Sequence, residues 1–143
     1  MLKLAALDIE DLAVISAHMQ DAILVSGDMT YSPRRRQFAL VANRFAWDEQ
    51  EQPQRRRTGL HFSRVLAVKT LNLAQGEADE VLSLLSISFA ELDAPSGEVL
   101  LSFSGGVTVR LMVECLECQM ADLGPAWQAS SVPHHSLDED ADL

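Results

Sequence analysis

The sequence predicts an α+β domain in which an N-terminal amphipathic helix packs on a largely antiparallel β-sheet of six or seven strands. Apolar residues recur at helical spacing in one segment near the N-terminus. Between Met29 and Met120 they recur at every second position within a series of segments separated by polar stretches, which is the period of a strand. The length of 143 residues corresponds to a single domain. Because consecutive strands usually pair, we expect a meander whose apolar face is covered by rolling into a barrel or folding into a sandwich.

The helix is predicted over residues 7–22. Asp8 is a favourable N-cap, and Glu10 and Asp11 place negative charge at the positive end of the helix dipole. Apolar residues then follow at helical spacing along one stripe, namely Leu12, Ile15, Met19, Ala22 and Ile23. We therefore expect the helix to cover an open end or flank of the sheet.

Strand periodicity continues through the rest of the chain. The predicted strands are residues 23–25, 29–31, 37–47, 58–71, 81–92, 98–104 and 107–113. Gly105-Gly106 gives the clearest hairpin turn. A parity change near Asn43-Arg44 predicts a bulge in the third of these strands, and alternation at 116–120 predicts a strand continuing past a bulge near Cys115, with a short helix as the alternative.

Other segments lack strand character. Residues 48–57 contain no apolar side chain and are predicted to form a solvated loop. Residues 1–129 are expected to make one domain, and residues 130–143, with four acids in the last six positions, a flexible acidic tail. On strand count alone, a small barrel of the pleckstrin-homology type is one candidate architecture.

Charge is distributed unevenly along the chain. The net charge is −10, yet residues 34–69 carry nine bases and only three acids. The acidic average makes nucleic acid and anionic membranes poor partners, whereas the basic segment is a candidate site for a small anion. No apolar run is long enough for a membrane helix, an acid at Asp8 interrupts any signal-peptide core, and cysteines number two, so we expect a cytoplasmic protein.

The basic segment supplies the candidate site. The predicted anion- or ligand-binding residues are Arg34, Arg35, Arg36, Arg44, Trp47 and Lys69. Residues 34–36 and 55–57 bracket a strand of about eleven residues and should lie roughly 30 Å apart, although 34–36 can approach Lys69. Arg44 can pair with a carboxylate such as Glu114 or pack its stem along an aromatic ring. Solvated loop charge is the alternative interpretation of the whole segment.

Two cysteines have the spacing of a redox pair or half a zinc site. These are Cys115 and Cys118, and His134-His135 could supply the other half of a zinc site. In a regular strand, positions three apart point to opposite faces, so we expect free thiols that act as small hydrophobes, without a metal or cofactor. Motifs for a nucleophile elbow, a phosphate loop or a zinc protease are not found in the sequence, and no catalytic residue is predicted.

A family resemblance extends over most of the chain, from about Leu2 to Trp127. It is carried by residues 11–12 (DL), 20–22 (QDA), 38–41 (FALV), 43–45 (NRF), Trp47, 82–85 (LSLL), 101–106 (LSFSGG), 110–115 (RLMVEC) and 122–123 (DL). In these segments the chain resembles DUF2948, a family of unknown function found mainly in alphaproteobacteria. The resemblance implies a bacterial, cytoplasmic, single-domain protein and carries no activity or ligand with it.

Two functions follow as hypotheses. The first is a non-catalytic protein-interaction or scaffold domain that binds a second copy or another protein, because apolar residues in 81–92 fall on both faces of that strand. The second is a small-ligand or anion-binding module, with or without enzymatic turnover, that uses the basic segment 34–69.

Overall fold

The computed structural model describes residues 1–46, 54–74, 78–124 and 127–128. In this described part of the chain, one α-helix, α1 (Ile9–Met19), accompanies eleven strands that all belong to one sheet. The strands are β1 (Lys3–Ala6), β2 (Ala22–Val25), β3 (Met29–Ser32), β4 (Gln37–Phe45), β5 (Gln54–Phe62), β6 (Val65–Leu71), β7 (Val81–Asp93), β8 (Ser96–Phe103), β9 (Thr108–Val113), β10 (Cys118–Asp122) and β11 (Trp127–Gln128). The predicted α+β class is confirmed.

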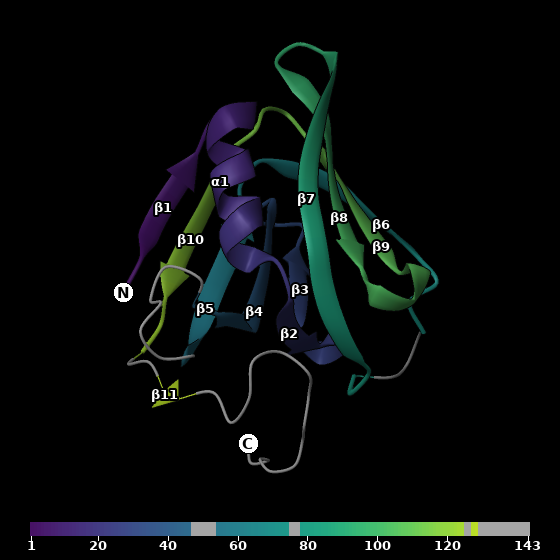
Figure 1. The fold of residues 1–143 in the computed structure, drawn as a ribbon. Coiled ribbons are helices and arrows are strands. Elements are labelled where there is room, and N and C mark those ends of the chain that lie inside the picture. The colour runs from purple at the N-terminus through teal and green to yellow at the C-terminus, as the bar shows by residue number, and fades with distance from the viewer. Residues whose placement is uncertain (47–53, 75–77, 125–126, 129–143) are drawn as a thin grey trace.

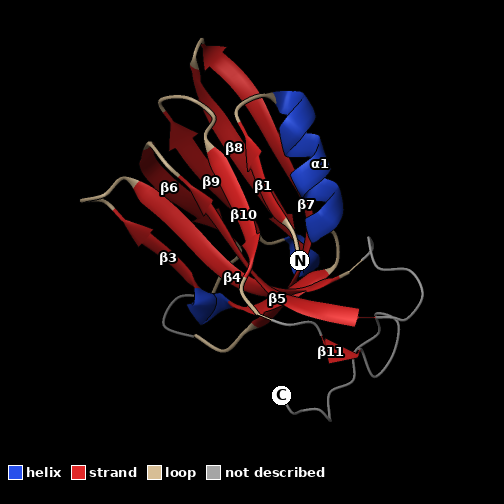
Figure 2. Cartoon of the chain, turned by 90° about the vertical axis from the view of Figure 1, so that its left-hand side faces the viewer, coloured by secondary structure: helices blue, strands red, loops and turns tan. Residues whose placement is uncertain are grey.

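The sheet is open, and its strand order departs from a simple meander. The order is β1-β10-β5-β4-β2-β7-β8-β9-β6, with β3 paired to β4 and β11 to β5. Each of these pairs is antiparallel. Among the described strands, β1 and β6 form the two edges (Figures 1 and 2). The expected count of six or seven strands is therefore wrong, and the sheet does not close into a barrel, one of the two expected arrangements.

The higher strand count has local causes. The predicted strand 58–71 is divided into β5 and β6 at Ser63-Arg64, where Arg64 has a φ of 60°, a left-handed conformation that interrupts extended backbone. Residues 54–57, predicted as loop, extend β5 at its beginning, while 48–53 lie outside the described residues. Two further strands raise the count: β1 was not predicted, and β10 was expected only as the continuation of the strand before Cys115.

The helix lies across the open side of the bent sheet. Figure 1 shows α1 between β1 and β10 on one side and β7 on the other, and α1 contacts β1, β4 and β7. Leu12, Ile15 and Met19 are buried, and Asp8 caps the helix by accepting a hydrogen bond from the Asp11 N–H at 2.8 Å. The helix is shorter than predicted because Ala22 already pairs with Leu84 in the sheet.

The two apolar faces of β7 have a geometric explanation. The β7–β8 register shifts between Leu84 and Ser86, and such a bulge reverses the parity of the residues that follow. Consequently Leu82, Leu84 and Ile87 are all buried, whereas Leu85 is exposed. The apolar residues on the two apparent faces of 81–92 motivated the predicted homodimer. In part they form a single row that faces the core.

Neither of the two bulges predicted from the sequence is found in the described strands. The β4–β5 register runs without a shift from Phe38 to Phe45, so Arg44 continues the inward row after Ala42. At Cys115 the chain does not continue one strand past a bulge or form a helix. Instead, residues 114–117 cross to the far end of the sheet, and β10 begins at Cys118 between β1 and β5.

Candidate functional site

The structure disperses the basic residues that the sequence grouped as an anion site. Arg34 and Arg35 are exposed in the turn between β3 and β4, and Lys69 is exposed on β6. Arg36 forms an ion pair with Glu114 at 3.1 Å. Its carbonyl accepts a hydrogen bond from Val65 at 2.7 Å, so the turn reaches the start of β6, four residues before Lys69. Trp47 lies outside the described residues.

Arg44 is fully buried and paired, and its partner was not foreseen. Its Nε donates to Oδ1 of Asp122 and its Nη2 donates to Oδ2, both at 2.9 Å, the two-point geometry that a guanidinium offers a carboxylate. Both side chains have 0% exposure. The suggested pairing with Glu114 is wrong, because Glu114 instead contacts Arg36 and Arg64.

Two further donors complete the surroundings of Asp122. The Thr58 hydroxyl donates to Oδ1 and the Leu2 N–H donates to Oδ2, each at 2.7 Å. Burial by itself raises the pKa of Asp122, but the hydrogen bonds from Arg44, Leu2 and Thr58 outweigh it and hold the pKa well below its usual range. The carboxylate therefore stays ionised and ties β4, β5, β10 and the start of β1 together.

Arg55 and Arg56 are also occupied within the protein. The Arg55 guanidinium lies 5.8 Å from the centre of the Phe45 ring and donates to the Asn43 carbonyl at 2.9 Å. Burial lowers the pKa of Arg55, and the nearby Asp21 partly offsets this effect. Nε of Arg56 lies 3.8 Å from Oδ2 of Asp122. These arginines serve the fold, and their neighbour Arg57 is exposed.

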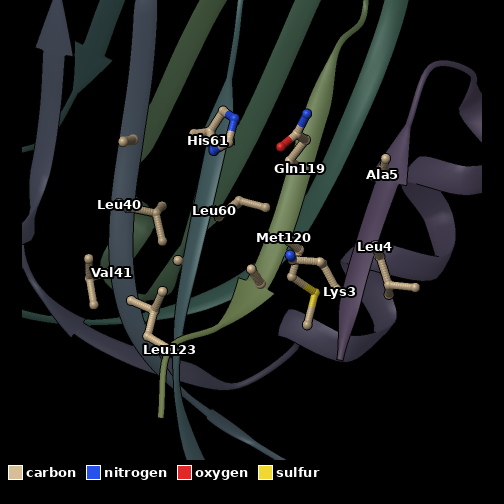
Figure 3. A pocket seen from close by; sticks show the side chains of 13 residues that line it. Lys3, Leu4, Ala5, Leu40, Val41, Leu60, His61, Gln119, Met120 and Leu123 are labelled. Carbon is tan, nitrogen blue, oxygen red and sulfur yellow. The ribbon is translucent and has the colours of Figure 1, made fainter. Parts of the chain in front are cut away.

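The opposite face of the same strands carries a hollow of about 590 Å³, which we call the outer-face hollow. Its lining residues come from β1, β4, β5 and β10 and from the residue after β10 (Figure 3). Register places Lys3, Ala121, Gly59 and Val41 in one row across these strands and Ala5, Gln119, His61 and Ala39 in the next. Of the intervening residues, Leu40, Leu60 and Met120 are buried on the core side, and Leu4 is half-buried against the core.

Small side chains create the hollow. Ala5, Ala39, Gly59 and Ala121 form its floor, where the solvent face of an antiparallel sheet ordinarily carries polar side chains. Leu123 leans over Gly59, since a Cβ added there would lie 3.5 Å from Cδ1 of Leu123. A separate, smaller hollow of about 140 Å³ shares Val41 and is lined also by Ile23, Arg57 and Asp28.

The polar groups of the outer-face hollow favour an anion. Figure 3 shows Lys3, His61 and Gln119 among the apolar side chains. Among the described lining residues there is no carboxylate, although the chain as a whole carries a net charge of −10. The hollow thus offers an ammonium, an imidazole and an amide to a ligand that rests on an apolar floor.

The cysteines do not form a metal centre in the described part of the chain. Cys115 is half-buried, Cys118 is buried, and both are free thiols. Burial raises the pKa of Cys118 to about 12, so this sulfur stays protonated and unreactive. No described group of three or more His, Cys, Asp or Glu residues has metal-binding geometry, and His134-His135 lie outside the described residues.

The sequence did not reveal Asp122 as the partner of Arg44 or the residues that line the outer-face hollow, although it carries a weak signal for each. Asp122 has the same strand parity as the apolar Cys118 and Met120, which marks an acid at an inward position. Gly59 and Ala121 occupy outward positions where polar residues are usual. Neither signal names a partner strand, so the assembly of the hollow could not be derived from it.

Among the described helices, none has the length and apolar character needed to cross a membrane.

Comparison with known proteins identifies a family and no individual relative. Neither the curated proteins nor the solved structures include a significant match. A family model described as "Protein of unknown function (DUF2948)" matches residues 2–135. This match covers nearly the whole chain, and the protein therefore belongs to the DUF2948 family.

Proposed function

We propose that this protein is a non-catalytic binding module that holds a small amphiphilic anion in the outer-face hollow. The observation that carries the proposal is the combination of a Gly/Ala floor with Lys3, His61 and Gln119 beside it. This proposal moves the anion site expected in the basic segment 34–69 to a different set of residues, because Arg44 is already paired with Asp122.

The size of the hollow supports a small molecule. Its volume of about 590 Å³ lies within the range of roughly 300–1,000 Å³ that ligand pockets occupy. Apolar area covered there contributes about 25 cal/mol per Å². Lys3 on β1 and His61 on β5 are separated by β10, which places their backbones about 10 Å apart across the sheet. A ligand can therefore rest its apolar body over Gly59 and Ala121 while its anionic group contacts Lys3.

The proposal is tested by titration calorimetry with sodium decanoate and with uncharged decanol. We expect decanoate to bind more tightly than decanol, because only the carboxylate gains from the ammonium of Lys3. Ala121→Leu fills the floor and should weaken decanoate binding at least tenfold, equivalent to about 1.4 kcal/mol. Ala67→Leu is the matched control, since Ala67 is a half-buried strand residue of β6 remote from the hollow.

Two outcomes would contradict this function. One is a decanoate affinity that is the same in the wild type and in Ala121→Leu. The other is tighter binding of decyltrimethylammonium than of decanoate, which would show that the charge preference is opposite to the one proposed.

Protein contact is the second candidate function, favoured by the exposed Leu85 and Leu92 on β7. The homodimer stays a prediction. A location in the bacterial cytoplasm also stays a prediction, and the low cysteine content of the chain supports it. Light scattering over a hundredfold range of concentration tests the dimer. A mass equal to one chain throughout would count against it.

A further inference from the structure

A second hollow is lined by residues from the start of α1, the β7–β8 hairpin and the β9–β10 connection, elements that meet in Figure 1. We call it the acidic end hollow. We propose that it docks a segment of another protein in which basic residues flank a large apolar side chain. The inference deepens the second candidate function, protein contact, and is separate from ligand binding because the two hollows share no lining residue.

Apolar side chains form the inner surface of the acidic end hollow. Leu116 is buried and Phe89 is half-buried, and both line it together with Pro95. At its margin Leu7 is 71% exposed and Ile9 is 55% exposed. Two large aliphatic side chains left in water beside an apolar depression are typical of a contact surface.

Carboxylates surround this apolar surface. Asp8, Glu10 and Glu91 all line the hollow, and its lining includes no described Lys or Arg. Asp8 and Glu10 also complement the dipole of α1, but Glu91 lies on β7 and has no such role. Glu10 and Glu91 form no ion pair within the described chain, whereas the neighbouring Glu114 and Glu117 are paired with Arg64.

The volume and the charge together favour a peptide segment as the occupant. At about 280 Å³, the hollow is smaller than most drug-sized sites and suits a single anchoring side chain, the usual centre of a protein contact. The surrounding carboxylates then attract Lys or Arg on either side of that anchor. An acidic or uncharged segment would meet uncompensated negative charge.

The experiment selects ligands without assuming a sequence. A phage library of random twelve-residue peptides is panned against the full chain, and the enriched peptides are synthesised and measured by fluorescence anisotropy. We expect an excess of Lys and Arg around at least one large apolar residue. Replacing that apolar residue by Ser should weaken binding at least tenfold.

Paired variants locate the contact. Leu7→Ala/Ile9→Ala removes the exposed aliphatic groups, and Glu10→Gln/Glu91→Gln removes two charges; each should raise the dissociation constant at least fivefold. Leu71→Ala, at another exposed leucine, and Asp28→Asn/Asp79→Asn, at two exposed acids, are the matched controls and should change it less than twofold. Melting temperatures within a few degrees of the wild type verify that all variants are folded.

Three results would overturn the inference: no enriched peptide, enrichment of neutral or acidic peptides, or cationic peptides whose binding survives both paired variants. The last result would leave protein contact in place and move it to another surface. A homodimer with no peptide enrichment would likewise refute this docking site and retain the second candidate function.

Discussion

Asp122 has its role set by what surrounds it rather than by its residue type. Desolvation alone would favour the protonated acid, yet Arg44, Thr58 and the Leu2 N–H all donate to the carboxylate. The bulge predicted at Asn43-Arg44 hid the inward position of Arg44, which follows from unbroken alternation after Phe38. Its partner is 78 residues away in the sequence, so the pairing required the three-dimensional arrangement of β4 and β10.

Asp122→Asn should destabilise the protein by about 3–5 kcal/mol at pH 7, because it leaves the buried Arg44 without its counter-ion. The pKa of Asp122 is lower in the folded protein than in the unfolded chain, where it is about 3.9. The stabilisation is therefore complete above that unfolded-state pKa and is lost as the pH falls toward the folded-state value.

Urea unfolding from pH 7 to pH 2 measures both effects. The acid-dependent loss of the free energy of unfolding should be smaller in Asp122→Asn than in the wild type. Glu114→Gln, which removes a carboxylate that is 40% exposed, is the control and should change stability by less than about 1 kcal/mol. Equal destabilisation by the two variants would refute the assigned role of Asp122.

The two cysteines should differ sharply in reactivity. Burial raises the pKa of Cys118 to about 12, so its thiolate is rare at pH 8, while Cys115 is only half-buried. Iodoacetamide at pH 8 should alkylate Cys115 first, and Cys118 should react only in denaturant. Peptide mass spectrometry distinguishes the sites, and rapid modification of Cys118 in the native protein would contradict its placement in the core.

At the scale of elements, most strand positions follow from alternation, and the errors occur where alternation is interrupted. Residues 98–104 closely match β8, and the turn at Gly105-Gly106 is confirmed, with positive φ at both glycines. The bulge at Leu85 and the left-handed Arg64 could not be predicted. Both depend on which neighbouring strand holds the register, and that information is nonlocal.

Gly97 in β8 has no room for a side chain. A Cβ there would clash with the Ala90 carbonyl oxygen and would lie 2.7 Å from Cζ of Phe89. Gly97→Ala should therefore destabilise the protein by about 1–3 kcal/mol, measured as a lower melting temperature. Gly124→Ala, where an added Cβ has no neighbour within 4 Å, should leave it nearly unchanged; an equal effect would contradict the predicted clash.

At the scale of the whole molecule, the sequence predicts the fold class but not the topology. The one-helix, antiparallel architecture follows from the two periodicities, whereas β10 joining β1 to β5 and β2 joining β4 to β7 bring together segments far apart in the chain. The outer-face hollow exists only through these long-range pairings, because its two rows are contributed by four strands. Its position could therefore not be predicted from local patterns.

The most direct test of ligand binding at the outer-face hollow is amide chemical-shift mapping of the ¹⁵N-labelled protein during titration with sodium decanoate. The proposed function predicts that the largest shifts cluster at Lys3, Gly59, His61, Gln119 and Ala121, on adjoining strands of one face. Shifts concentrated on β6, β8 and β9, or no shift at millimolar decanoate, would contradict it.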